Sequence, residues 1–172
     1  MVPRKRRGEP DQPSLPPIGR EGAAMLEAVP FFAGLSKRSR RRLAEVAQQV
    51  LYTPGAIVVA AGTPGGAAFF VIVDGVASVR RDSHELARLE RGEFFGELSL
   101  LDGKRRAATV VAVSELTTIR VTREGFRELV AGDPDVAFQI MEVLGERIRA
   151  LEDVIDRMRS QATEDDVSRP QP

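Results

Sequence analysis

The chain has 172 residues, which is enough for one domain of ordinary size with tails. It carries 25 Lys and Arg against 25 Asp and Glu, and this net charge of zero provides no global attraction to nucleic acid or to an acidic membrane. The chain has no cysteine and one histidine, His84, so disulfides and cysteine metal sites are excluded and acid–base catalysis lacks its commonest residue. We expect neither an enzyme nor a metal protein.

The two ends have the composition of disordered tails. Residues 1–20 hold five of the eleven prolines and the basic cluster Arg4 to Arg7, and residues 161–172 are polar and end in Pro170-Gln171-Pro172. The basic cluster is either a solvated tail or a patch for nucleic acid or membrane. No apolar run approaches the roughly 20 residues that cross a bilayer. We therefore expect a cytoplasmic protein without a membrane segment.

Residues 21–50 show apolar side chains at spacings of three and four, which predicts helices. Ser36 is a plausible N-cap for one of them. The polar face of that helix carries Lys37, Arg38, Arg40, Arg41 and Arg42. This basic face is either simply solvated or a surface for an acidic partner.

Residues 50–122 change to short β-branched runs separated by glycine turns, which is typical of an all-β sandwich or jelly-roll barrel. Asp74-Gly75 between two alternating runs indicates a hairpin. Ser83-His84-Glu85 indicates a hairpin tip with His84 exposed. The predicted strands are Ile57–Val59, Phe69–Val73, Val76–Val79, Leu86–Leu89, Ala107–Val113 and Leu116–Val121.

Residues 123–160 return to a helical period. A short helix over 123–131 is followed by Asp133-Pro134, an N-cap and first-turn proline that begin a long helix ending near Ser160. An apolar heptad seam runs along it: Met141, Leu144, Ile148, Leu151, Ile155 and Met158. The seam packs either on the chain's own barrel, as we expect for its first two turns, or on a second subunit, which favours a parallel homodimer through this helix.

The segment from Phe94 to Val110 carries the chemistry. Gly96 precedes a short apolar helical turn, and a glycine there lets backbone N–H groups approach an anion. Arg106 can return to the same place and offer a bidentate fork. Glu97 suits an acceptor for ligand hydroxyls. Alternatively, Glu97 only complements the helix dipole or forms a structural ion pair with Arg106.

Phe95 to Leu100 and Arg106 to Val110 resemble the phosphate-binding cassette of the cyclic nucleotide-binding domain family. That family includes bacterial catabolite activator proteins and protein kinase A regulatory subunits, and the resemblance covers about residues 28–158. It implies a mainly β jelly-roll barrel flanked by N-terminal helices and a long C-terminal helix. It also implies that Glu97 accepts the ribose 2′-hydroxyl and that Arg106 pairs with the cyclic phosphate. The backbone of Gly96, Leu98, Ser99, Ala107 and Ala108 would complete the pocket.

The resemblance favours cAMP as the ligand, with cGMP as the alternative. Members that prefer cGMP tend to have Thr or Ser after the arginine, whereas this chain has Ala107. Adenine would have to be covered by Ile148, Leu151 or Ile155, from this subunit or its partner.

Binding has to be read out by something that moves, and the helices after the barrel are the candidates. Transcription factors of the family follow the long helix with a helix-turn-helix, whereas this chain continues into a polar tail. We therefore expect no direct DNA binding and an unidentified effector protein as the partner. The alternative is a nucleotide-independent dimerisation or docking module that retains the fold.

Overall fold

The computed structural model describes residues 17–27, 29–63 and 68–167. The chain divides into two compact units, residues 1–134 and residues 135–172, and each is described by itself. Residues 1–16 and 168–172, which belong to the predicted tails, lie outside the described residues.

The first unit begins with three helices: α1 (Gly19–Glu27), α2 (Pro30–Ala33) and α3 (Lys37–Val46). Ser36 is the N-cap of α3 as predicted, since its side chain accepts a hydrogen bond from the backbone N–H of Ser39 at 3.1 Å. The prediction of helix up to residue 50 was wrong. The chain enters strand β1 at Ala47, because pairing with another strand outweighs the helical spacing of its apolar residues.

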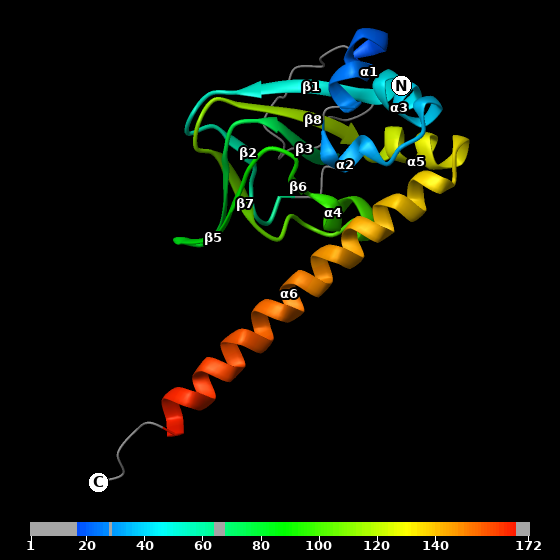
Figure 1. Cartoon of the computed structure of the whole chain (residues 1–172). Helices are drawn as coiled ribbons and strands as arrows, with labels where there is room; N and C mark the ends of the chain where they lie inside the picture. Colours follow the sequence, from blue (N-terminus) through cyan, green and yellow to red (C-terminus); the bar gives the residue numbers. More distant parts are fainter. Residues whose placement is uncertain (1–16, 28, 64–67, 168–172) are drawn as a thin grey trace. The chain divides into compact units, whose positions relative to one another are not determined.

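Two four-stranded antiparallel sheets form the barrel, in the orders β1-β8-β3-β6 and β2-β7-β4-β5 (Figure 1). The mainly β jelly-roll with flanking helices is confirmed. The strands are β1 (Ala47–Tyr52), β2 (Ile57–Val59), β3 (Ala68–Asp74), β4 (Ala77–Arg81), β5 (His84–Leu89), β6 (Phe94–Phe95), β7 (Thr109–Ala112) and β8 (Leu116–Thr122).

The Asp74-Gly75 turn is not a hairpin, and that prediction was wrong. β3 pairs with β8 in one sheet, whereas β4 pairs with β7 in the other, so the turn carries the chain from one sheet to the other. Gly75 has φ +92°, and a Cβ there would collide with the carbonyl of Glu115. A glycine is therefore needed for a close crossing rather than for a hairpin.

Apolar side chains from both sheets fill the barrel. Phe70 and Ile72 of β3 face Val110 and Ala112 of β7 in this core, and Phe95 of β6 joins them. Phe70 and Phe95 are directly opposite in the β3–β6 pair, and their rings stack with centroids 5.0 Å apart and planes 9° apart. This stack fixes the end of β6, the point at which the chain enters the short helix α4 (Glu97–Asp102).

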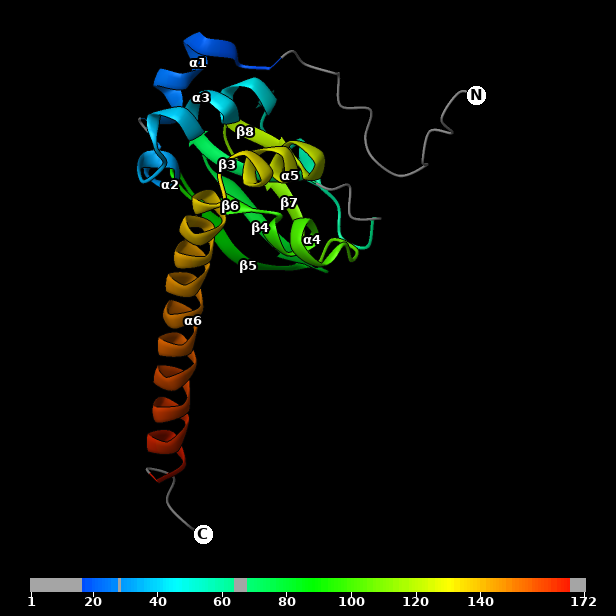
Figure 2. The same cartoon turned by 90° about the vertical axis from the view of Figure 1, so that its right-hand side faces the viewer.

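Helix α5 (Arg123–Gly132) follows β8 and completes the first unit. Thr122 is its N-cap and accepts a hydrogen bond from the backbone N–H of Gly125 at 3.1 Å. A Cβ on Gly125 would lie 3.0 Å from Cβ of Val46, so α5 packs closely on α3. Figure 2 shows α4 and α5 along the same side of the barrel.

The second unit is helix α6 (Asp135–Val167). It extends beyond Ser160, so the prediction of a disordered tail from residue 161 was wrong for 161–167. The helix continues because this segment contains good helix formers such as Ala162 and Glu164, and the next proline is Pro170. About half of each side chain of Met141, Ile148, Leu151 and Ile155 is exposed. Among the described residues, no helix combines the length and apolar character needed to cross a membrane.

Candidate functional site

The site begins at Gly96, between β6 and α4. Gly96 has φ +88°, in the left-handed region, and is the N-cap of α4. A Cβ at this position would lie 2.7 Å from Nη1 of Arg106 and 2.9 Å from the carbonyl oxygen of Ala68. Glycine is therefore required here both by its backbone conformation and by the close approach of an arginine.

Arg106 is buried beside Gly96, with 6% of its surface exposed. Its Nη2 donates to the carbonyl of Ala68 at 2.9 Å, and its Nη1 donates to the carbonyl of Gly96 at 3.2 Å. The guanidinium carbon lies 5.9 Å from the ring centroid of Phe70. Two backbone carbonyls and an aromatic face thus hold the cation in a buried position. Its attraction to an anion is stronger there than in bulk water.

The main chain around Arg106 is also fixed. Its N–H donates to the carbonyl of Thr63 at 3.2 Å, and its carbonyl accepts from the N–H of Gly62 at 2.9 Å. Arg105 next to it is exposed and donates through Nη1 to the carbonyl of Gly62 at 2.6 Å. This reciprocal pairing positions the segment that follows α4 against the turn after β2.

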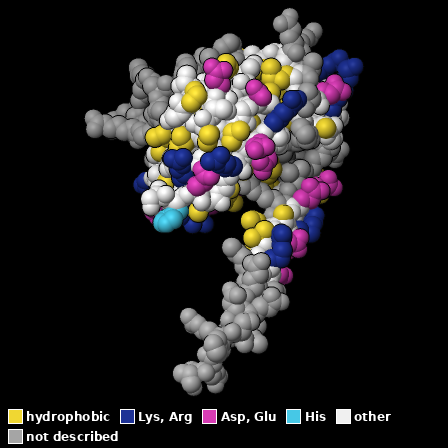
Figure 3. Space-filling view, turned by 60° about the vertical axis from the view of Figure 1, so that its left-hand side comes forward, with side chains coloured by type: hydrophobic (Ala, Val, Ile, Leu, Met, Phe, Trp, Pro, Cys, Tyr) yellow, Lys and Arg dark blue, Asp and Glu magenta, His cyan; other side chains and the backbone are white. Residues whose placement is uncertain are grey.

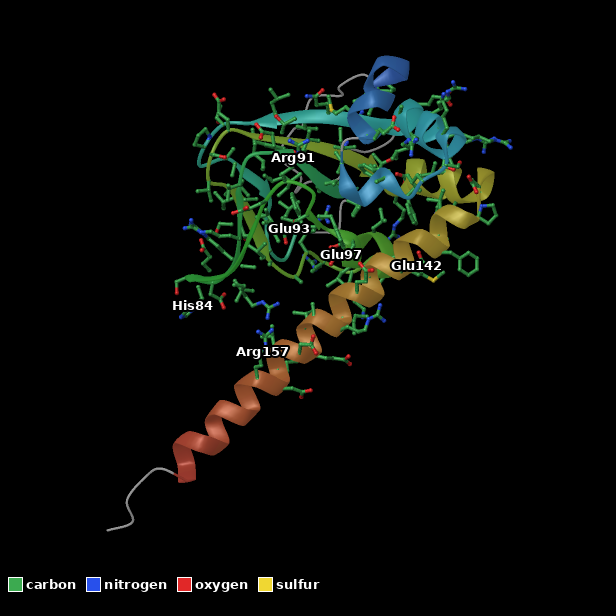
Figure 4. The ribbon with its side chains drawn as sticks, in the orientation of Figure 1. His84, Arg91, Glu93, Glu97, Glu142 and Arg157 are labelled. Carbon is green, nitrogen blue, oxygen red and sulfur yellow. The ribbon has the colours of Figure 1, made fainter. Side chains whose placement is uncertain are left out.

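The remaining predicted pocket residues lie around this arginine. Glu97 is the first residue of α4 and is half-buried, and Figure 4 shows it far from His84. The first N–H groups of a helix lack intrahelical acceptors, so those of Glu97, Leu98 and Ser99 are suitably placed for an anion. The Ser99 side chain is buried and Leu98 is exposed, while Ala107 is exposed and Ala108 is half-buried.

Sequence reasoning missed the residues that hold the arginine from β3. Ala68 supplies a carbonyl and Phe70 supplies a ring, and neither carries a side chain that signals a polar site. Phe70 reaches the site because β3 pairs with β6, which places Phe70 opposite Phe95. Such a non-local register is not readable from the local pattern.

The three predicted base-covering residues, Ile148, Leu151 and Ile155, lie on α6. Each is exposed, at 57%, 56% and 46% respectively. Because α6 is a unit of its own, their contact with the base stays a prediction.

A second polar cluster lies on the outer face of β4 and β5. The Ser78 hydroxyl donates to Oε2 of Glu85 at 2.7 Å, and Nε of Arg88 donates to Oε1 at 2.9 Å. These hydrogen bonds, that of Ser78 foremost, lower the pKa of the Glu85 carboxyl below its ordinary value. His84 is exposed at the end of this hairpin, as predicted, and Figure 3 shows it at the edge of a surface of mixed charge. The cluster is internally paired and separate from Arg106.

Comparison with protein families identifies the domain that contains both clusters. The model of the cyclic nucleotide-binding domain matches residues 49–133, which include Gly96, Glu97 and Arg106. Residues 49–133 belong to the cyclic nucleotide-binding domain family. The resemblance found in the sequence is thereby confirmed.

This cyclic nucleotide-binding domain is similar to part of the regulatory subunits of cAMP-dependent protein kinase. It is 36% identical over 115 residues to that of Aspergillus fumigatus and 33% identical over 114 residues to that of Schizosaccharomyces pombe. Each match covers 66% of this chain but only 28% and 27% of the relative. The chain thus spans less than a third of the length of these curated relatives.

Solved structures give the same result for the fold. The catabolite activator protein of Thermus thermophilus is 30% identical with a TM-score of 0.66, covering 76% of this chain and 63% of that one. The cAMP-bound PfPKA-R fragment is 25% identical with a TM-score of 0.66, covering 81% and 46%. The regulatory subunit of a cAMP-independent protein kinase A from Trypanosoma brucei, 24% identical with a TM-score of 0.60 over 70% and 46%, shares the fold alone. The ligand therefore has to be argued from the residues of the cyclic nucleotide-binding domain.

Proposed function

We propose that this chain is a cAMP sensor whose cyclic nucleotide-binding domain holds the cyclic phosphate at Arg106 and the ribose at Glu97. The observation that carries the proposal is the buried guanidinium of Arg106, held by the carbonyls of Ala68 and Gly96 at the start of α4. A buried cation beside helix N–H groups suits a small anion such as a cyclic phosphate diester.

The ribose and the base are assigned to residues around that anion. Glu97 begins α4 directly after Gly96, and its carboxylate is an acceptor for the 2′-hydroxyl. Ala107 presents a methyl group where a hydroxyl would favour guanine, so cAMP is the expected ligand and cGMP the competitor. Ile148, Leu151 and Ile155 are proposed to cover the adenine, from this subunit or from its partner.

The signal is proposed to pass through the helices that follow the barrel to an effector protein. The relatives are regulatory subunits of a kinase, which supports a protein rather than DNA or a membrane as the receiver. The exposed apolar residues of α6 support association with a second copy of the chain, because a heptad seam is complementary to itself.

Titration calorimetry of the full chain with cAMP, cGMP and 5′-AMP tests the proposal. We expect cAMP to bind most tightly, and Arg106→Ala to cost about 2–5 kcal/mol of binding free energy, because a buried charge pair is lost. Arg105→Ala is the matched control: it removes the same charge from the neighbouring, exposed position and should leave the affinity within about threefold, a difference of about 0.7 kcal/mol.

Two outcomes would contradict the proposal. If the folded wild-type chain gives no binding with any cyclic nucleotide, the nucleotide-independent dimerisation or docking module is the better description. If the Arg106 and Arg105 variants lose the same affinity, Arg106 is not the phosphate ligand. Circular dichroism of each variant establishes that it is folded.

A further inference from the structure

The far end of α4 contacts α5 through the carbonyl of Ser99. The carbonyl of Ser99 accepts two hydrogen bonds, one from the N–H of Gly103 at 3.1 Å and one from Nη2 of Arg123 at 2.6 Å. Arg123 is the first residue of α5. A side chain of α5 therefore binds the last turn of the helix that begins at the nucleotide site.

The guanidinium of Arg123 also lies against Gly103, the C-cap of α4. Gly103 has φ +71°, and a Cβ built on it would be 3.1 Å from both Nη1 and Nη2 of Arg123. The equal distances place both arms of the fork over the end of the helix. The carbonyl of Ser99 already accepts the N–H of Gly103, and Arg123 adds a second, charged donor at the negative end of the helix. Arg123 thus acts as a cap for α4 supplied by another helix.

One donor of this cap is unused. Nε of Arg123 is buried, and it has no hydrogen-bond partner among the residues that the structure describes. A buried donor without an acceptor is unfavourable, so this arrangement of α4 and α5 leaves a hydrogen bond to be gained. A second arrangement that satisfies Nε is the kind of alternative that a ligand can select.

The other end of α5 is fixed as well. Asp133, directly after α5, accepts a hydrogen bond through Oδ2 from the hydroxyl of Ser39 in α3. Together with the close packing of Gly125 on Val46, this ties α5 to α3 along its length. Because these contacts hold α5 and α3 together, a displacement at Arg123 would move the two helices as one body rather than distort the first turn of α5 alone.

We propose that Arg123 is the positioning residue that couples the nucleotide site to α5. The inference rests on the proposed function: a ligand at Gly96 and Arg106 shifts α4, and the fork of Arg123 on Ser99 and Gly103 moves α5 with it. Without the fork, the pocket binds its ligand but α5 does not respond.

Hydrogen exchange of the full chain, with and without saturating cAMP, tests this coupling. In the wild type we expect cAMP to slow exchange in both α4 and α5. Arg123→Ala should keep the effect in α4, lose it in α5, and weaken cAMP binding roughly fivefold or more, the lower end of measured couplings. Arg127→Ala is the matched control, since it removes an exposed arginine one turn further along α5 and should behave as the wild type.

Arg123→Lys covers the case in which the alanine variant does not fold. Lysine keeps the charge and can reach one carbonyl, but it cannot place two N–H arms over Gly103, so the response of α5 should be partly restored. A full response of α5 in a variant that lacks the arginine overturns the inference while leaving cAMP binding intact.

If the wild type does not bind cAMP, the proposed function fails, and the chain without nucleotide then decides the inference. In that case Arg123→Ala should still speed exchange in the last turn of α4 and the first turn of α5 together. A change in α4 alone would show that Arg123 caps one helix without coupling two.

Discussion

Gly96→Ala is the sharpest test of the local geometry of the site. An alanine at φ +88° costs about 1–2 kcal/mol, because the left-handed conformation is strained for residues with a Cβ. The added methyl would also lie 2.9 Å from the carbonyl oxygen of Ala68 and 2.7 Å from Nη1 of Arg106. The carbonyl belongs to a paired strand, so the overlap has to be relieved by moving α4 or the guanidinium, and overpacking of this kind costs about 1–3 kcal/mol.

Gly55→Ala provides the matched control. Gly55 has φ +84°, and nothing lies within 4 Å of a Cβ built there, so its substitution carries the backbone strain without the collision. Urea unfolding should therefore show a loss of about 2–5 kcal/mol for Gly96→Ala and about 1–2 kcal/mol for Gly55→Ala. Calorimetry should show a loss of cAMP affinity of about tenfold or more for Gly96→Ala alone, or about 1.4 kcal/mol. Equal losses of stability in the two variants would refute the close packing of Arg106 on Gly96.

Three further predictions concern other parts of the chain. Glu97→Gln should weaken binding of cAMP but leave binding of 2′-deoxy-cAMP nearly unchanged in calorimetry; equal weakening of both ligands would remove Glu97 from the ribose. Leu151→Glu should convert a dimer to a monomer in sedimentation velocity, whereas Arg149→Glu, off the seam, should not; a monomeric wild type would contradict the seam. The hydrogen bond from Ser78 is the main cause of the lowered pKa of the Glu85 carboxyl. The ionised carboxylate therefore stabilises the fold at pH values above its ordinary pKa, and this contribution is lost as the pH falls through the pKa of the folded state. The urea midpoint of the wild type should therefore approach that of Glu85→Gln as the pH falls below about 4.5, the ordinary pKa of a glutamate, and a constant difference would contradict it.

The part of the site that is local in the chain could be predicted. Gly96, Glu97 and the start of α4 lie within a few residues, and the predicted glycine before a short helical turn is observed as the N-cap of α4, although its left-handed conformation was not predicted. The convergence of Arg106 on Gly96 was also predicted, because the chain between them, α4 and the Gly103 turn, is short enough to return the arginine to the glycine. Local spacing determines what a short segment can reach, so these inferences did not depend on the rest of the fold.

The parts that depend on strand pairing could not be predicted from local patterns. Residues 47–50 have helical spacing but pair with β8, and Asp74-Gly75 has a hairpin composition but joins two sheets. The contribution of Ala68 depends on β3 lying beside β6, a contact between segments that are well separated in the chain. The final turns of α6 were missed for a different reason: a polar composition is compatible with a helix as well as with a tail.

The carbonyl of Ala68 has a consequence for how this site can diverge. Every type of residue has the same main-chain carbonyl oxygen, whatever its side chain. The guanidinium of Arg106 is therefore held by a group that no substitution at position 68 removes. The side chain at position 68 is buried in the apolar core, so it is constrained to be both small and apolar. Glycine could replace alanine in a descendant without loss of this carbonyl, and an inventory of matching side chains would overlook both carbonyls that hold the arginine.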